Sequence, residues 1–292
     1  MPSCSPDDAR CLAPEQREYP GRLRDLASPP RQLWVRGTLV MAEPPAVAIV
    51  GTRRSTPYGE RVARAIAVAC ARAGVCVVSG LARGIDGAAH GGALEADGRT
   101  VAVLGTGIDQ YYPRQHRALQ ERIARDGLIM SEFGPGDAGH GGAFPLRNRL
   151  IAALADVTVV VEAPESSGAL NTARYARELG RTLAVVPHNI DSVSGRGCNR
   201  LLRSEHAEPI LAPDDVLALL HLAATPSVGL TLDGDAALCW HALTRGAGDA
   251  MTIARDTGLT LRQVSVVLAM LEIDGLVCFD AAGQVRPSPG VA

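Results

Sequence analysis

The chain has 292 residues, of which 47% are apolar, enough to bury an extensive core without disulfides or metals, so a mainly disordered chain is excluded. Its 29 basic residues against 31 acidic ones give a formal charge of -2, which confines any site for a polyanion to a local patch. All the basic residues are arginine, so lysine Schiff-base chemistry and the lysine-bearing phosphate loop are excluded as well.

The seven cysteines form no CxxC pair and no Cys/His cluster at zinc spacing, which indicates free thiols in a reducing compartment. No segment reaches the roughly 18 apolar residues that span a bilayer, and the N-terminus lacks the apolar core of a signal peptide. We therefore expect a cytoplasmic protein that makes no membrane contact.

A lead-in segment over residues 1–43 precedes a region, residues 44–220, in which short apolar runs alternate with longer Ala/Arg-rich stretches. This alternation is typical of a parallel sheet covered by helices on both faces. The expected strands, all continuous Val/Ile/Leu runs, cover residues 47–50, 75–79, 100–104, 127–131, 157–162 and 183–187. The expected helices cover residues 59–73, 85–96, 114–125, 146–155, 169–179 and 214–220. Thr56 suits the N-cap of the first of these helices, and Gly74 suits its end.

A linker is expected over residues 221–235, followed by a small helical domain over 236–292. Two helices, residues 251–257 and 260–273, flank Gly258, and residues 275–285 read as a two-stranded wing that turns at Ala281, Ala282 and Gly283, the layout of a winged helix. The second helix offers only Arg262 and Gln263 near its start, whereas a reader of duplex DNA needs a basic face. We therefore favour a protein-contact or accessory role for this domain.

Small and polar residues follow four of the expected strands, at residues 51–54, 79–84, 105–107 and 166–168. Ligands of open parallel sheets bind outside the carboxyl ends of the strands, where helix N-termini offer backbone N–H groups to phosphate. Any one such loop is explained by a tight turn alone, but four together favour a phosphate-binding crevice.

Arginines concentrate around this crevice. Arg53, Arg83, Arg147 and Arg149 are placed to hold a polyanion mainly by its backbone. The alternative, that some of them pair with Glu132, Glu162 or Asp86 to brace the loops, stays open, and both can hold at once. Aromatic residues make up only 3% of the chain, so base stacking is limited to Phe144, Tyr111 and Tyr112.

No catalytic or metal-binding constellation is recognisable, so we expect neither an enzyme nor a cofactor. The sequence Gly105-Thr106-Gly107 lacks the third glycine of the dinucleotide fingerprint. His90 and His188 are expected to be structural or solvated, and Glu162 has no partner placed by spacing for general acid-base work.

Five motifs in order and spacing resemble the DprA/Smf family of DNA-processing proteins. They are VGTRRSTPYG at 50–59, SGLARGIDGAAH at 79–90, LGTGIDQYYP at 104–113, FPLRNR at 144–149 and EAPESSGALNTA at 162–173. Tyr19-Pro20, Pro29-Pro30 and residues 33–37 are similar to that family's lead-in, so the resemblance covers about residues 19–220.

This resemblance implies an extended Rossmann-like domain, doubly wound and mostly parallel, followed by a small C-terminal winged helix. It also implies a homodimer that binds and protects single-stranded DNA and helps to load RecA in DNA uptake, natural transformation and recombination. The residues expected to contact DNA or phosphate are Gly51, Thr52, Arg53, Arg54, Gly80, Arg83, Gly105, Phe144, Arg147, Asn148, Arg149, Ser167, Gly168 and Thr172.

The chain departs from the family pattern at His188, where relatives carry glycine, and at Glu205-His206, where they carry small residues. These groups can alter a loop beside the crevice or the dimer surface. The alternative function is that of a sensor or hydrolase for a free nucleotide-derived ligand, although the Pro-Gly-Gly-x-Gly-Thr motif of the phosphoribohydrolase relatives is missing. A purely structural adaptor leaves the arginines in the strand-end loops unexplained.

Overall fold

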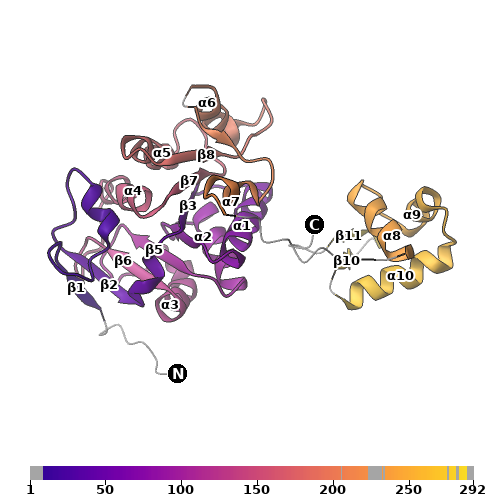
Figure 1. Ribbon diagram of the computed structural model, residues 1–292, viewed down its shortest axis with the longest axis horizontal. Coiled ribbons are helices and arrows are strands. Elements are labelled where there is room, and N and C mark those ends of the chain that lie inside the picture. The colour runs from indigo at the N-terminus through magenta and orange to yellow at the C-terminus, as the bar shows by residue number, and fades with distance from the viewer. Residues whose placement is uncertain are drawn as a thin grey trace. The chain divides into compact units, whose positions relative to one another are not determined.

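A mostly parallel sheet forms the centre of the larger of two units in this computed structural model (Figure 1). The units are residues 1–225 and 226–292, and the structure describes residues 9–204, 206–222, 232, 234–274, 276–280 and 283–287. In the described part of the chain the sheet has nine strands in the order β1-β2-β6-β5-β4-β3-β7-β8-β9. The strands are β1 (Arg10–Leu12), β2 (Leu33–Gly37), β3 (Ala46–Val50), β4 (Cys76–Ser79), β5 (Thr100–Leu104), β6 (Leu128–Ser131), β7 (Val157–Val160), β8 (Thr182–Val185) and β9 (Glu208–Pro209).

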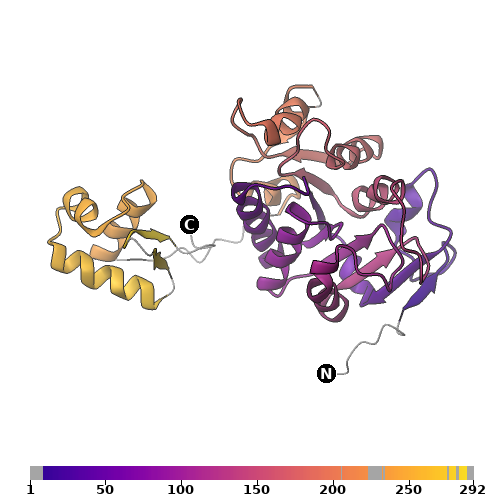
Figure 2. The same cartoon turned by 180° about the vertical axis from the view of Figure 1, so that it is seen from behind.

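The strands from β3 to β8 confirm the six runs expected from the sequence to within one or two residues. β3 through β9 pair in parallel, whereas β1 and β2 add to β6 as an antiparallel edge. Helices cover both faces, as continuous apolar strands require (Figures 1 and 2). They are α1 (Pro57–Arg72), α2 (Ile85–Glu95), α3 (Arg117–Asp126), α4 (Ala143–Leu154), α5 (Ala169–Glu178), α6 (Arg196–Ser204) and α7 (Asp215–Leu219).

Alternate residues of each strand point into different cores. Val101 and Val103 of β5 pack with side chains of α4 and α5, while Ala102 and Leu104 pack with α2 and α3. α1 and α7 share the α2 face of the sheet. The Rossmann-like sheet covered on both faces is therefore confirmed.

The local signals for α1 are confirmed. The Thr56 hydroxyl accepts a hydrogen bond from the Gly59 N–H, Pro57 occupies the first turn, and Gly74 follows the helix with a φ of +74°. α4 begins at Ala143, three residues before the expected start, because Pro145 falls in the first turn, where its missing N–H costs no helical bond. The stretch expected as one helix from 114 divides into a 3-10 turn, Arg114–His116, and α3.

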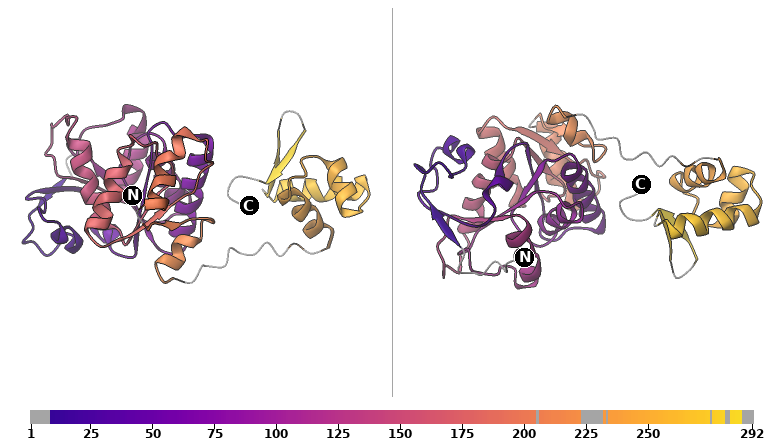
Figure 3. Two further views of the ribbon diagram at one scale, coloured as in Figure 1. Left: turned by 90° about the horizontal axis from the view of Figure 1, so that it is seen from above. Right: turned by 60° about the horizontal axis from the view of Figure 1, so that its bottom comes forward.

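The described residues of the second unit form three helices and a pair of strands: α8 (Gly234–Thr244), α9 (Ala250–Thr257), α10 (Leu261–Ile273), β10 (Val277–Phe279) and β11 (Val285–Pro287). Gly258 turns the chain between α9 and α10 with a φ of +74°, and β10 and β11 pair antiparallel (Figure 3). α9, α10 and the strand pair follow in the expected order, whereas α8 was not expected and begins at Gly234, within the expected linker. The winged-helix assignment stays a prediction. Ala281 and Ala282 of the expected turn, and most of the expected linker, lie outside the described residues.

Candidate phosphate-binding site

The chain reverses its winding direction between β3 and β7. From β3 it proceeds through β4 and β5 to β6 on one side, and from β7 through β8 to β9 on the other. The loops that follow these two neighbouring strands therefore diverge and leave a crevice at the carboxyl end of the sheet, the usual ligand site of open α/β folds. A cavity of about 690 Å³ occupies this position.

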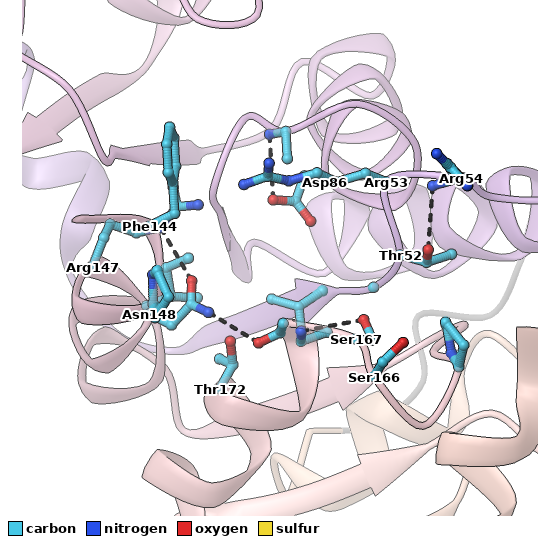
Figure 4. Close-up of a pocket in the computed structure, with 18 of the residues that line it drawn as sticks. Thr52, Arg53, Arg54, Asp86, Phe144, Arg147, Asn148, Ser166, Ser167 and Thr172 are labelled. Carbon is cyan, nitrogen blue, oxygen red and sulfur yellow. Dashed lines mark hydrogen bonds between the residues drawn. The ribbon is translucent and has the colours of Figure 1, made fainter. Parts of the chain in front are cut away.

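All the residues expected to contact DNA line this cavity, except Gly80, Arg83, Gly105 and Arg149. Figure 4 shows that the labelled side chains come from the loop after β3, the first turn of α2, the first turns of α4, and the β7–α5 loop with the start of α5. The lining residues that were expected are Gly51, Thr52, Arg53, Arg54, Phe144, Arg147, Asn148, Ser167, Gly168 and Thr172.

Glu162, at the end of β7, holds the loop that carries Arg53 and Arg54. Its backbone carbonyl accepts from the Thr52 N–H at 2.7 Å, and its carboxylate accepts from the Thr56 N–H at 2.9 Å and from the Thr56 hydroxyl at 3.1 Å. The side chain is fully buried, so the carboxylate braces the entry to α1.

Arg147 lies under the cavity, with its guanidinium buried among backbone carbonyls. It donates to the carbonyl oxygen of Gly80 at 2.7 Å and also to that of Val103. Burial lowers the pKa of Arg147 to about 10, and the nearby Asp86 carboxylate counteracts that shift. At neutral pH the guanidinium is therefore still charged.

Asp86 lies beside Arg147 and lines the same cavity. Its carboxylate accepts from the N–H groups of Gly80 and Ala82 at 3.2 and 3.3 Å. Burial raises its pKa, while the Arg147 charge and the two backbone hydrogen bonds lower it. Arg147 thus acts on Asp86 only through its nearby charge, and the expected alternative, in which an arginine pairs with Asp86, is not seen among the described residues.

A cation and two rings meet at the mouth of the cavity. The guanidinium carbon of Arg53 lies 4.9 Å from the centre of the Phe144 ring, and the Tyr112 ring lies 5.0 Å from it on a tilted plane. Arg53 is exposed and Phe144 half-buried, so a charge and a π face are both open to a ligand. Stacking of a base on Phe144 and contact of its phosphate with Arg53 are compatible with this arrangement.

Two of the expected glycines lie behind the cavity wall. A Cβ on Gly80 would overlap the Arg147 guanidinium, and one on Gly105 would lie 2.7 Å from the Phe144 ring. These glycines make room for the side chains that line the cavity, and do not line it themselves.

Two of the expected arginines lie elsewhere. Arg149 is buried and donates to both carboxylate oxygens of Glu132 at 2.6 and 2.8 Å, which is the bracing alternative. Arg83 is exposed and makes no hydrogen bond or ion pair with any described residue, but it does not line the cavity. The structure therefore brings together Arg53, Arg54 and Arg147, and separates Arg149 from them.

The β7–α5 loop closes the cavity opposite α4. The Ala169 N–H donates to the Ser167 hydroxyl at 3.3 Å, and the Asn148 side-chain amide donates to the Gly168 carbonyl at 3.1 Å. The amide of Asn148 thus ties the start of α5 to α4. Both helices start at this cavity, which favours an anion there.

Lining residues that were not among the expected contacts include Asp86, Tyr112 and Ser166. Tyr112 was expected near the crevice as one of its few rings, and Asp86 was expected only as a partner that braces an arginine. Ser166 lies in the loop 166–168, which was expected to form part of the phosphate-binding crevice.

His90 and His188 make structural contacts. His90 is fully buried with Nδ1 2.7 Å from the Thr100 hydroxyl, and burial, with His116 and Arg147 adding to it, lowers its pKa to about 3. His188 reaches the Val161 carbonyl through Nε2 at 2.8 Å. Within the described residues, no group of three or more acidic, histidine or cysteine side chains is arranged to hold a metal ion. None of the helices in that part of the chain is long and apolar enough to cross a bilayer.

The fold and the cavity define an open Rossmann-like α/β protein with a cavity at its switch point. A family model described as DNA recombination-mediator protein A matches residues 10–221. The chain belongs to this family, known from its members as DprA or Smf.

Three relatives show how much of the chain is shared. Protein Smf of Synechocystis sp. is 45% identical over 72% of this chain, which spans about half (53%) of that protein's length. A putative DNA processing protein DprA of Mycobacterium tuberculosis is 41% identical over 94% of this chain and 77% of its own length. The DNA processing protein DprA of Streptococcus pneumoniae is 39% identical over 68% of this chain and 70% of its own length.

Two solved structures share the fold. DprA of Streptococcus pneumoniae superimposes with a TM-score of 0.69 at 36% identity and covers 72% of this chain and 73% of its own. DNA processing protein A of Helicobacter pylori, whose structure concerns its binding of single-stranded DNA, superimposes with a TM-score of 0.66 at 32% identity and covers 73% of this chain and 95% of its own.

Proposed function

We propose that this chain binds single-stranded DNA in the switch-point cavity, mainly through the phosphate backbone and with little base selectivity. The observation that carries the proposal is the meeting of Arg53, Arg54 and Arg147 with the starts of α4 and α5 in one open cavity. Charged arginines and helix N-termini both favour phosphate, and neither reads a base edge.

The ring of Phe144 supports a single strand in preference to a duplex. Its half-buried face, flanked by Arg53 and Tyr112, gives one unstacked base a surface on which to lie. In a duplex the bases are already stacked on each other and cannot reach a ring at the wall of a cavity. The Helicobacter pylori relative, which binds single-stranded DNA, supports the same ligand for this chain.

We further propose that the chain protects the bound strand and passes it to RecA in DNA uptake, transformation and recombination. We also propose that it does so as a homodimer and without catalysis. The family membership supports this part of the proposal. A RecA filament-assembly assay on DNA coated with a single-strand-binding protein tests it, with faster assembly expected on adding this protein and an unchanged rate counting against it.

Fluorescence anisotropy with labelled single-stranded and duplex oligonucleotides across a salt series tests DNA binding. We expect preference for the single strand and a linear fall in log affinity with log salt concentration, because each phosphate contact releases condensed counterions. Mononucleotides added as competitors are expected to displace little DNA. Displacement by a single mononucleotide would instead assign the cavity to a free nucleotide ligand, and binding that ignores salt would contradict a phosphate-based site.

A further inference from the structure

Helix α10 of the second unit has a row of apolar side chains on its outer face. Its inner face, with Val264, Leu268 and Leu271, is buried in the core of the unit. On the opposite face Val266 is 55% exposed, Met270 60% and Ile273 85%. Exposed apolar side chains are common singly, but a row of them along one helix marks an interaction surface.

The exposed positions repeat with the spacing of a coiled-coil seam. Arg262, Val266, Ala269 and Ile273 follow at intervals of four, three and four residues, so at about 100° per residue they form one stripe directly opposite the core. All four are exposed, and Ala269 is small enough to let another backbone approach closely. We call Arg262, Val266, Ala269, Met270 and Ile273 the α10 face.

The charges at the two ends of α10 are opposite in sign, so two copies of the helix complement each other in only one orientation. Arg262 lies at the start of the helix, and Glu272 and Asp274 flank Ile273 at its end. None of these three makes an ion pair with any described residue. If two copies pair antiparallel, Arg262 of each lies beside the acids of the other, whereas a parallel pair would bring like charges together.

The same antiparallel register matches the apolar side chains. With Arg262 opposite Ile273, Val266 lies opposite Ala269, so a larger side chain faces a small one on both sides of the two-fold axis. Such a self-complementary patch is what a two-fold dimer contact requires. Duplex DNA fits the face poorly, because three of its five members are exposed Val, Met and Ile and two acidic residues, Glu272 and Asp274, flank one end of it.

We propose that α10 pairs antiparallel with α10 of a second copy of this chain, through the α10 face. The helix has 13 residues, about 20 Å of length, so the contact alone is small compared with a standard interface. It strengthens an association of two copies that are already held near each other. The pairing is a property of the second unit and needs no ligand in the cavity.

Sedimentation velocity of the full chain without DNA, over a range of concentrations, tests the proposal. Val266→Glu places two like charges near the two-fold axis in the middle of the seam, and we expect it to raise the concentration needed for self-association at least tenfold. Met251→Glu, at a similarly exposed apolar residue on α9 outside the face, is the matched control and should associate like the unaltered chain. Thermal unfolding confirms that both variants stay folded.

A charge exchange tests the orientation. Arg262→Glu alone, and Glu272→Arg with Asp274→Arg alone, should each weaken self-association, because like charges then face each other. Mixing the two variants should restore it, since every ion pair is re-formed across the mixed pair. The proposal is overturned if the unaltered chain does not self-associate, if Val266→Glu associates as the unaltered chain does, or if the mixture is no better than either variant.

Discussion

The Arg147 guanidinium lies where the Cβ of any residue other than glycine at position 80 would be. It donates to the Gly80 carbonyl at 2.7 Å, and a Cβ on Gly80 would overlap it. The small residue after β4 is thus needed for the position of a charged group from α4, and only indirectly for the ligand.

Gly80→Ala is expected to destabilise the fold by about 1–3 kcal/mol, the usual cost of overpacking a filled site, and to weaken DNA binding by displacing Arg147. Chemical denaturation and anisotropy measure the two effects. Gly91→Ala, in α2, is the matched control: its Cβ would meet only the Arg64 side chain at 3.8 Å, so we expect no loss of stability. A Gly80→Ala protein that binds and unfolds like the unaltered chain would contradict the role assigned to Gly80.

Arg53 and Arg83 are expected to differ in their contribution to DNA binding. Arg53→Ala removes a charged donor at the cavity mouth and should cost about 1.5–3 kcal/mol, roughly tenfold to a hundredfold in affinity. The slope of log affinity against log salt should fall by about 0.7 for each lost phosphate contact. Arg83→Ala should change little, because Arg83 lies outside the lining. Equal losses in the two variants would extend the site beyond the cavity.

Phe144→Leu is expected to weaken single-strand binding by about 1–3 kcal/mol, the value of one stacked base, without changing the salt slope. The contrast with Arg53→Ala separates stacking from charge. Tyr111→Leu is the control, since the Tyr111 ring lies 4.9 Å from the Arg117 guanidinium and does not line the cavity. If Phe144→Leu lowers the salt slope as Arg53→Ala does, the ring acts only by holding the arginine.

Arg149→Ala is expected to act on stability and not on DNA affinity. It leaves the Glu132 carboxylate without the two hydrogen bonds that Arg149 donates, at a cost of about 1–3 kcal/mol in the free energy of unfolding. Arg149→Met combined with Glu132→Gln should recover part of that loss, because both charges are then removed. Anisotropy on the folded fraction should match the unaltered chain; a weakened affinity there would return Arg149 to the site.

His90 makes the fold sensitive to acid. Burial lowers its pKa from 6.5 to about 3 in the folded chain, so between these values the unfolded chain binds the proton and the folded chain does not. The contribution of His90 to the free energy of unfolding is therefore complete above pH 6.5. It declines by about 1.4 kcal/mol per pH unit as the pH falls towards 3. Urea unfolding at several pH values should show this decline.

His90→Leu should remove that part of the decline, because no proton is then taken up at this position. The Thr100 hydroxyl keeps its bond to the Val77 carbonyl at 2.9 Å, so the substitution leaves no unpaired group there. If His90→Leu shows the same acid sensitivity as the unaltered chain, the proton uptake lies elsewhere.

The buried parallel strands could be predicted because strands covered on both faces are continuous apolar runs, as in residues 46–50 and 157–160. The antiparallel edge could not: β1 has three residues, one of them Arg10, and nothing local distinguishes it from a loop. The sequence also could not predict the direction in which a given side chain points. Arg147 and Arg149 lie two residues apart on α4, yet one reaches Gly80 and the other Glu132, and only the tertiary structure separates them.

The antiparallel edge bears on what a protease would do to this protein. Within residues 10–37, β2 pairs with β6 and β1 pairs with β2, and the segment contributes Tyr19, Leu23 and Leu33 to the core. A cut between β2 and β3 followed by loss of the leading fragment would leave β6 as a bare edge with a row of free N–H and C=O groups beside exposed apolar side chains. Such an edge is a template for other chains, so the trimmed protein should precipitate.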